Sequence, residues 1–301
     1  MIIITGTKRS GTSMWMQILQ ASGIQVLGPA FNKSWKETIE DANKRGFYET
    51  RFRKGIYYAT NPNPVSGKWL SPKVSRHWGV KVFIPGVVRS DIVYLSRVIA
   101  SVRPWRQYTT SLRRLYEMEE KAHREKGTGD LLSKHLDPIL EWWLENFLLI
   151  RDITTRRYPA RLISYETMVS EPDRICDRII PWLGAGDPKK AAEAVHPEDR
   201  TQHASSSSNI EHEFAEVFDE YHERIKTETP FDESFLSKMN ETHEALLPEI
   251  EEALAQLSAA ALQLKEKRQK AIQEGTWKGK PEPQDQALNP DRLAALLHSS
   301  S

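Results

Sequence analysis

Short apolar runs alternate along the chain with longer segments in which apolar positions recur every three to four residues. The short apolar runs, typical of buried strands, cover residues 1–4, 79–84, 98–102 and 160–164. The segments with helical spacing cover residues 13–22, 105–126, 131–157 and 173–183. Because strands that alternate with helices form parallel sheets, the pattern predicts an α/β fold with a mostly parallel sheet covered by helices.

Three regions lie outside this alternation. Residues 29–78 are rich in Asn, Pro, Gly and Trp, and predict loops with short helices, suited to a lid or an acceptor site. Residues 232–272 carry leucines at helical spacing, which favours a packing helix, with a partner-binding helix as the alternative. The composition of residues 274–301 is typical of a loose tail or an extended arm. We therefore predict a main domain over 1–230, a helical extension over 231–273 and the tail.

Composition limits the classes of function. The chain has 301 residues, of which 39% are hydrophobic, so it can bury a substantial core. The 42 Lys and Arg residues balance 41 Asp and Glu residues, so we expect no nucleic-acid partner, and any anion site must be a local cluster. Cys176 is the single cysteine, which points to a reducing, cytoplasmic location. No apolar run is long enough for a membrane span, and the apolar start is too short for a signal peptide.

A glycine-framed loop follows the first predicted strand. Residues 6–13 read Gly-Thr-Lys-Arg-Ser-Gly-Thr-Ser, which has the frame of a phosphate-binding loop. In nucleoside triphosphatases a Lys follows the second Gly, but Thr12 stands here, and the basic residues Lys8 and Arg9 come earlier. The loop resembles the 5′-phosphosulfate loop of the sulfotransferases that use 3′-phosphoadenosine 5′-phosphosulfate (PAPS). An ordinary turn between strand and helix is the alternative interpretation.

The resemblance covers roughly residues 1–200 and implies a P-loop-like sulfotransferase fold. Arg103 at the end of the third strand and Ser111 eight positions later match the pair that holds the 3′-phosphate in this family. Tyr165, in a Tyr-Glu pair after the fourth strand, matches a tyrosine that borders the adenine. A strand-capping Arg, a surface Ser and a core Tyr are the structural alternatives. The donor-binding residues that the resemblance implies are Lys8, Arg9, Ser10, Gly11, Thr12, Ser13, Arg103, Ser111 and Tyr165.

Sulfuryl transfer requires a donor held in line and cations that neutralise the developing charge. Arg9 and Lys81 are the predicted cations. Lys81 opens a segment that resembles the Lys-x-His-x-Pro strand end of the cytosolic branch, but Phe83 occupies the position of the catalytic His. Since Phe cannot accept a proton, we predict Glu49 as the general base, in a segment that resembles bacterial-type members. The alternatives are Glu49 as a structural ion-pair partner and His77 as the base. His196 and His203 also remain open as bases, although neither has a partner visible in the sequence.

The predicted function is transfer of a sulfuryl group from PAPS to a hydroxyl or amine of a small-molecule, carbohydrate or lipid acceptor, which leaves 3′-phosphoadenosine 5′-phosphate. A P-loop kinase of small molecules, a non-catalytic nucleotide-binding relative and an unrelated nucleotide-binding domain remain as alternatives. We expect no metal site, because the His and Cys spacing matches no common ligand set. A homo-oligomer is compatible with the sequence, which determines neither the oligomeric state nor the acceptor.

Overall fold

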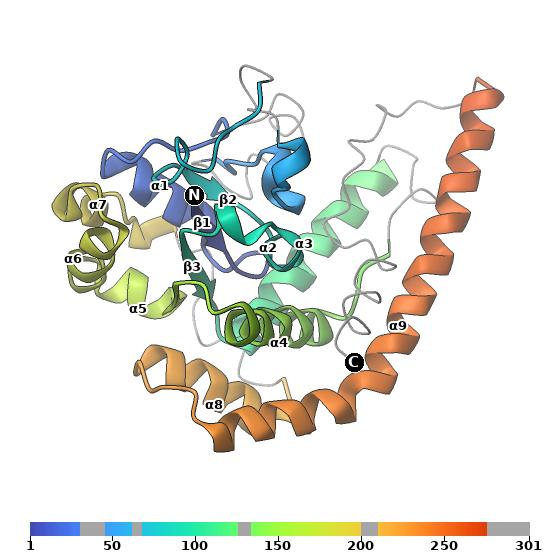
Figure 1. Cartoon of the computed structure of the whole chain (residues 1–301). Helices are drawn as coiled ribbons and strands as arrows, with labels where there is room; N and C mark the ends of the chain where they lie inside the picture. Colours follow the sequence, from blue (N-terminus) through green and yellow to red (C-terminus); the bar gives the residue numbers. More distant parts are fainter. Residues whose placement is uncertain (31–45, 62–67, 126–133, 200–209, 276–301) are drawn as a thin grey trace.

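A parallel sheet lies at the centre of the protein. The computed structural model in Figure 1 describes residues 1–30, 46–61, 68–125, 134–199 and 210–275. All described strand pairs are parallel, in the order β2-β1-β3-β4. The strands are β1 (Ile2–Thr5), β2 (Gly79–Lys81), β3 (Arg97–Val102) and β4 (Ala160–Ser164). The predicted α/β fold with a parallel sheet is therefore confirmed.

Helices cover both faces of this sheet, because the side chains of each strand alternate between the faces. Ile2 and Ile4 pack in one apolar cluster with α1, α6 and α7, whereas Ile3 packs in another with α2 and α4. The helices are α1 (Thr12–Ala21), α2 (Ile84–Arg89), α3 (Trp105–Glu125), α4 (Pro138–Arg156), α5 (Tyr165–Ser170), α6 (Pro172–Leu183), α7 (Pro188–Glu193), α8 (Ala215–Lys226) and α9 (Glu233–Gln273). Short 3₁₀ helices are η2 (Arg51–Lys54), η3 (Tyr58–Thr60), η4 (Ile92–Tyr94) and η6 (Pro197–Asp199).

The second strand and the long fourth helix differ from their predicted ranges. β2 ends at Lys81 rather than residue 84, because Phe83 caps α2 and a proline stands in the first turn of that helix. α4 begins at Pro138, where the side chain of Asp137 accepts a hydrogen bond of 2.8 Å from the N–H of Ile139. Residues 131–133 of the predicted helix lie outside the described residues. The short helices α2, α5 and α7 and the helix α8 were not predicted.

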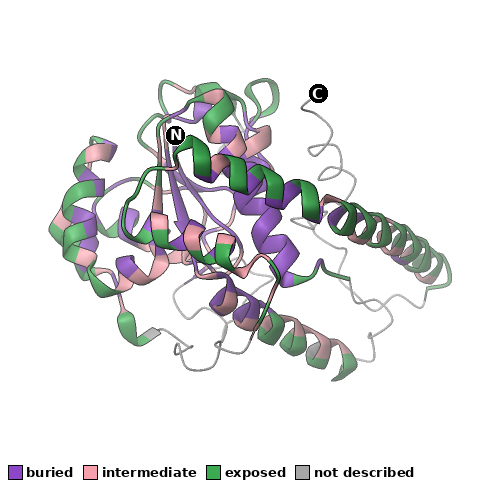
Figure 2. Cartoon of the chain, turned by 90° about the horizontal axis from the view of Figure 1, so that it is seen from below, coloured by how far each residue is buried: buried purple, intermediate pink, exposed green. Residues whose placement is uncertain are grey.

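An aromatic core joins α3, α4, α8 and the first half of α9. The ring of Phe218 on α8 lies 5.0 Å from that of Trp143 and 5.5 Å from that of Trp142, both on α4. Figure 2 shows the resulting contrast between buried α4 and the exposed outer face of α9. The residues that α9 contributes to this core are Phe235, Met239, Leu246, Ile250 and Leu254. The predicted helix over 232–272 is thus present, and its first half packs in the same core as α3, α4 and α8.

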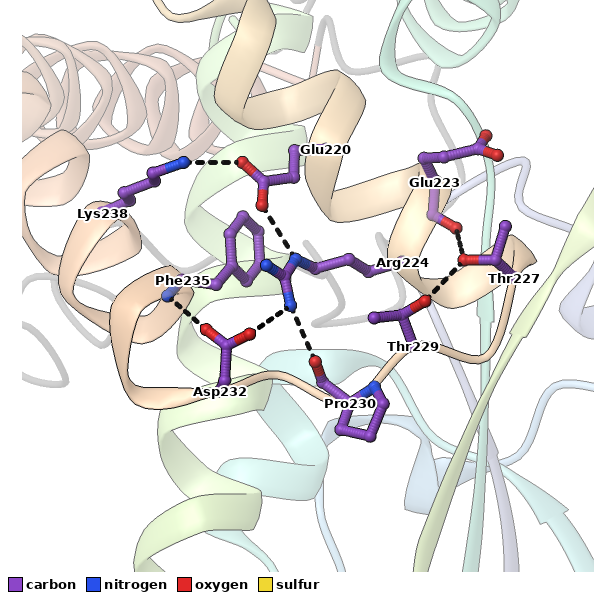
Figure 3. Close-up of polar contacts among 9 residues, drawn as sticks. All are labelled: Glu220, Glu223, Arg224, Thr227, Thr229, Pro230, Asp232, Phe235 and Lys238. Carbon is purple, nitrogen blue, oxygen red and sulfur yellow. Dashed lines mark hydrogen bonds and ion pairs between the residues drawn. The ribbon is translucent and has the colours of Figure 1, made fainter.

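Two features set the path of α9. Pro248 lies inside the helix, where it removes a backbone donor, and α9 bends along its length in Figure 1. At the start of α9, Arg224 of α8 donates to Glu220 (2.9 Å) and to Asp232 (3.0 Å), and Lys238 of α9 donates to Glu220 (3.1 Å) (Figure 3). Asp232 also caps α9 through the N–H of Phe235 at 2.9 Å. This network fixes the turn between α8 and α9. No helix among the described residues is long and apolar enough to cross a membrane.

Candidate functional site

The loop between β1 and α1 lies at the carboxyl edge of the sheet, where loops from all four strands meet. Three of its residues have positive φ, namely Gly6 (144°), Arg9 (63°) and Gly11 (91°). Gly11 stands at the N-cap of α1 and provides no side-chain cap, and the first turn of α1 contains no acidic residue. The N–H groups and the positive end of α1 are therefore directed into this loop, which suits an anion.

Contacts with β3 hold the loop in this conformation. The hydroxyl of Ser101 donates to the carbonyl oxygen of Ser10, and Arg103 donates to the carbonyl oxygen of Arg9 at 3.1 Å. The indole N–H of Trp142 in turn donates to the carbonyl oxygen of Arg103 at 2.9 Å. Because each of these hydrogen bonds is made within the protein, the loop is organised before any ligand binds.

Gly6 allows the loop to approach the backbone of β3 closely. A Cβ at Gly6 would overlap the carbonyl oxygen of Ser101 and lie 2.6 Å from the hydroxyl of Ser10, whereas a Cβ at Gly23 would meet nothing within 4 Å. Both glycines have positive φ. We expect Gly6→Ala to lower the free energy of unfolding by about 3 kcal/mol, against about 1 kcal/mol for Gly23→Ala, measured by urea denaturation. Equal losses in the two variants would show that the loop does not need this approach.

The structure brings together four of the residues assigned to the donor. The Nε atom of Arg9 lies 3.4 Å from the hydroxyl of Ser111, and the guanidinium of Arg103 lies 5.0 Å from the ring centroid of Tyr165. A Cβ on Gly11 would lie 2.6 Å from the same tyrosine ring, so the loop backbone touches it. Residues from the loop after β1, the residue after β3, α3 and the start of α5 thus meet at the carboxyl edge of the sheet.

This cluster is basic and largely buried. Arg103 is 5% exposed and Ser111 is 4% exposed. Burial lowers the pKa of Arg9, and the nearby charge of Arg114 lowers it further while Tyr165 opposes the shift. An arginine remains protonated despite such a shift, because its ordinary pKa lies so far above neutrality. Two guanidinium groups and a hydroxyl in this arrangement suit a doubly charged phosphate.

Lys81, Glu49 and Ser13 form a second cluster beside the loop. The ammonium of Lys81 lies 3.3 Å from a carboxylate oxygen of Glu49 and 3.4 Å from the hydroxyl of Ser13, and it donates to the carbonyl oxygen of Phe47 at 2.8 Å. Burial lowers the pKa of Lys81, and Glu49 offsets part of this effect. Arg53 binds the other carboxylate oxygen of Glu49. The predicted base is thus connected to the loop through one lysine, and it also fulfils the structural role of an ion-pair partner.

Lys8 is the assigned donor residue that points away from the other cations. Its ammonium lies 3.1 Å from Glu141 and 3.5 Å from the hydroxyl of Tyr116, which donates to Glu141 at 3.2 Å. Burial lowers the pKa of Lys8, but Glu141 and Glu145 outweigh burial and raise it overall. Lys8 therefore anchors the loop to the buried acids of α4, and the geometry does not place its charge beside Arg9 and Arg103.

Glu145 is a buried carboxyl group with a displaced ionisation. Burial and the carboxylate of Glu141 raise its pKa well above the ordinary value, although Lys8 acts in the opposite direction. The unfolded chain ionises this group at lower pH than the folded protein, so folding becomes less favourable as pH rises through that interval. We expect Glu145→Gln to raise the melting temperature by about 2–4 °C at pH 8, and by less at pH 5. The exposed substitution Glu249→Gln is the control, and a pH-independent gain would contradict this explanation.

The structure describes two of the other histidine candidates, His77 and His196. His77 precedes β2, so it lies at the amino edge of the sheet, opposite the loop, near Gly184. His196 pairs with Glu198 at 3.0 Å, and His203 lies outside the described residues. A shallow hollow of about 340 Å³ contains no assigned donor residue, and is lined by Gln17, Gln20, Ala21, Tyr48, Ala194 and His196. The structure therefore places His77 apart from the glycine-framed loop.

Known proteins provide no independent assignment. No family model matches the chain, and no curated protein matches it. Among the residues that the structure describes, no group of three or more His, Cys, Asp and Glu side chains is placed to hold a metal ion.

Several residues of the site were missed in the sequence. Ser101 is the polar residue inside the apolar run of β3, and that interruption was a usable signal. Glu141 and Glu145 lie one helical turn apart in a segment rich in Trp, Leu and Phe, which also indicated buried acids. Arg53 gave no such signal, because its pairing with Glu49 depends on the folded conformation of the loop that contains both residues.

Proposed function

We propose that this protein is a PAPS-dependent sulfotransferase that acts on a hydroxyl or amine of a small-molecule, carbohydrate or lipid acceptor. The observation that carries the proposal is the meeting of Arg9, Ser111, Arg103 and Tyr165 beside the glycine-framed loop. These residues are scattered over much of the chain, yet they match, in order and type, the donor-binding residues of the family that the loop resembles. The proposal includes a P-loop-like sulfotransferase fold and a reducing, cytoplasmic location.

In the proposed complex, the loop binds the 5′-phosphosulfate of the donor and the basic cluster binds its 3′-phosphate. In the proposed complex the 5′-phosphosulfate lies against the N–H groups at the start of α1, since anions bind well at such helix ends. Arg103 and Ser111 hold the 3′-phosphate, and Tyr165 borders the adenine. The contact between Arg9 and Ser111 connects the two parts, so Arg9 can neutralise charge on the leaving phosphate.

The reaction forms one bond and breaks another. The acceptor oxygen bonds to sulfur as the bond from sulfur to the bridging phosphate oxygen breaks, and 3′-phosphoadenosine 5′-phosphate leaves. The acceptor proton passes to the carboxylate of Glu49, and Lys81 carries the positive charge beside the transferred group. Lys81 lies close enough to Ser13 to serve this purpose from β2.

The kinase alternative has less support from the same geometry. Thr12 stands where a P-loop kinase has its phosphate-binding Lys, and the described strands end in Thr5, Lys81, Val102 and Ser164 rather than in an acid that could hold Mg²⁺. Cys176 does not provide an alternative nucleophile. Burial raises the pKa of its thiol to about 12, and the charges of Asp173 and Asp177 add to this effect.

Calorimetric titration tests the proposal. The wild-type protein is titrated with 3′-phosphoadenosine 5′-phosphate, ADP, and ATP with Mg²⁺. We expect the 3′-phosphorylated nucleotide to bind at least 100-fold more tightly than ADP, roughly the value of one buried Arg–phosphate contact. Preference for ATP with Mg²⁺ would favour the kinase. Tight binding without turnover on a broad acceptor panel would favour the non-catalytic relative.

A further inference from the structure

Exposed large hydrophobic side chains are concentrated in the part of the chain between residues 57 and 93. Among the described residues, such side chains outside this part are Met118, Leu262 and Ile272. Those inside it are Tyr57 (38% exposed), Tyr58 (52%), Trp69 (48%), Val74 (63%), Ile92 (53%) and Val93 (50%). A concentration of this kind on a protein surface indicates an interaction site.

Two of these side chains touch directly, and a hydrogen bond to Asp91 connects them with the segment that carries Ile92 and Val93. The rings of Tyr58 and Trp69 meet edge to face with centroids 5.1 Å apart, and the indole N–H of Trp69 donates to the carbonyl oxygen of Tyr58 at 2.6 Å. The N–H of Tyr58 donates to the carboxylate of Asp91 at 2.6 Å, which brings Ile92 and Val93 alongside. We call Tyr57, Tyr58, Trp69, Ile92 and Val93 the aromatic patch.

The aromatic patch lies on one flank of the sheet. η2, which leads into it, packs against the edge strand β2, whereas α8 packs against β4 at the other edge. Figure 1 accordingly shows this segment and α8 on opposite sides of the molecule. The aromatic patch therefore does not belong to the helical core, and α9 does not cover it.

The exposed charges of the same part of the chain are mostly basic. Among the described residues between 46 and 102, the exposed basic residues are Arg51, Lys68, Lys73 and Arg76, and the exposed acidic residue is Asp91. Arg53 and Lys81 do not contribute to this surface, because both are buried against Glu49. Lys68 is exposed beside Trp69, and Lys73 is exposed beside Val74. The surface around the aromatic patch thus attracts anions.

We infer that the aromatic patch and its basic surround dock on an anionic lipid surface. Trp and Tyr favour the boundary between lipid headgroups and acyl chains, and Lys and Arg favour anionic headgroups. The exposed aliphatic Ile92 and Val93 distinguish this partner from an acidic glycan, because a hydrated glycan offers no apolar phase to receive them. A second copy of the chain fits less well, since a two-fold contact would bring the same positive charges together.

Docking of this kind is peripheral, and it goes beyond the proposed transfer reaction. It requires neither the donor nor the loop between β1 and α1. Failure of nucleotide binding would leave it intact, and failure of lipid binding would leave the donor site intact.

Vesicle co-sedimentation tests the inference with the full chain. We expect binding to vesicles of phosphatidylcholine with about a quarter phosphatidylglycerol, little binding to phosphatidylcholine alone, and weaker binding as salt increases. The double substitution Lys68→Glu with Lys73→Glu should weaken binding about 30-fold or more. Trp69→Ala with Ile92→Ser should weaken it about tenfold, because less apolar surface then enters the membrane.

Matched substitutions elsewhere distinguish docking through the aromatic patch from a general effect of net charge or of exposed apolar surface. Lys265→Glu with Lys267→Glu on exposed α9, and Met118→Ser on α3, should change vesicle binding less than about threefold. Equal binding by the patch variants and these controls would overturn the inference, as would absence of binding to anionic vesicles. Binding to a soluble acidic glycan but not to vesicles would assign the patch to a glycan. Dimerisation abolished by Trp69→Ala, without vesicle binding, would assign it to a second copy.

Discussion

Replacing Arg103 by Ala should weaken the binding of 3′-phosphoadenosine 5′-phosphate by about 10²–10³-fold, measured by calorimetric titration. Arg103 is 5% exposed and lies between the loop backbone and the ring of Tyr165, so another cation cannot easily replace it. Its loss removes charge-assisted hydrogen bonds to the proposed 3′-phosphate. ADP binding should change much less, because ADP lacks that phosphate.

Arg97 supplies the matched control, because it lies at the opposite end of the same strand. Its guanidinium lies 5.4 Å from the ring centroid of Trp182, far from the loop. Arg97→Ala should leave nucleotide affinity within about threefold of wild type, and circular dichroism should confirm that both variants fold. An unchanged dissociation constant in the Arg103 variant would remove the 3′-phosphate assignment and, with it, the main support for PAPS as the donor.

Glu49→Gln should lower kcat for sulfuryl transfer by about 10²–10⁴-fold while leaving the donor dissociation constant nearly unchanged. The amide keeps the size of the side chain but cannot accept the acceptor proton. Single-turnover kinetics with the best acceptor, together with calorimetry, would measure the two quantities separately. The split between them matters because Glu49 also binds Lys81 and Arg53.

A structural role for Glu49 predicts a different result. If the carboxylate only positions Lys81, donor affinity should fall along with the rate, and Glu49→Asp should restore neither. His77→Ala serves as the control, because His77 lies at the amino edge of the sheet and should not affect the rate. Full activity of Glu49→Gln would move the proton acceptor to another side chain.

The sequence predicted the four strands and the longer helices α1, α3 and α6, but not the short helices α2, α5 and α7. β4 lies at Ala160–Ser164 as predicted, because a short apolar run between Pro159 and a polar residue has few alternatives. β2 was predicted too long because Val82, Phe83 and Ile84 continue the apolar run. Their role as the cap and first turn of α2 depends on the contact between the N–H of Phe83 and the carbonyl oxygen of Arg53, at 2.9 Å.

The site was predictable only as far as local spacing determines it. The spacing of Arg103 and Ser111 placed both at the end of β3 and on the next helix, and Arg9 meets Ser111 there. Lys8 was grouped with Arg9 because they are neighbours in sequence. The two side chains have different partners, because Lys8 forms an ion pair with Glu141, more than 130 residues away in the sequence. No local pattern indicates such a distant pairing.

The position of β1 in the sheet has a consequence for how the chain is made. β1 pairs with β2 on one side and β3 on the other, so its partners are Gly79–Lys81 and Arg97–Val102. A ribosome adding about 5–20 residues per second needs on the order of 5–20 s to reach the end of β3. During that interval the run Ile2–Ile4 has no native strand to pair with, and closing such long loops is slow. A chaperone that binds the nascent segment Ile2–Ile4 during this interval should therefore increase the soluble yield.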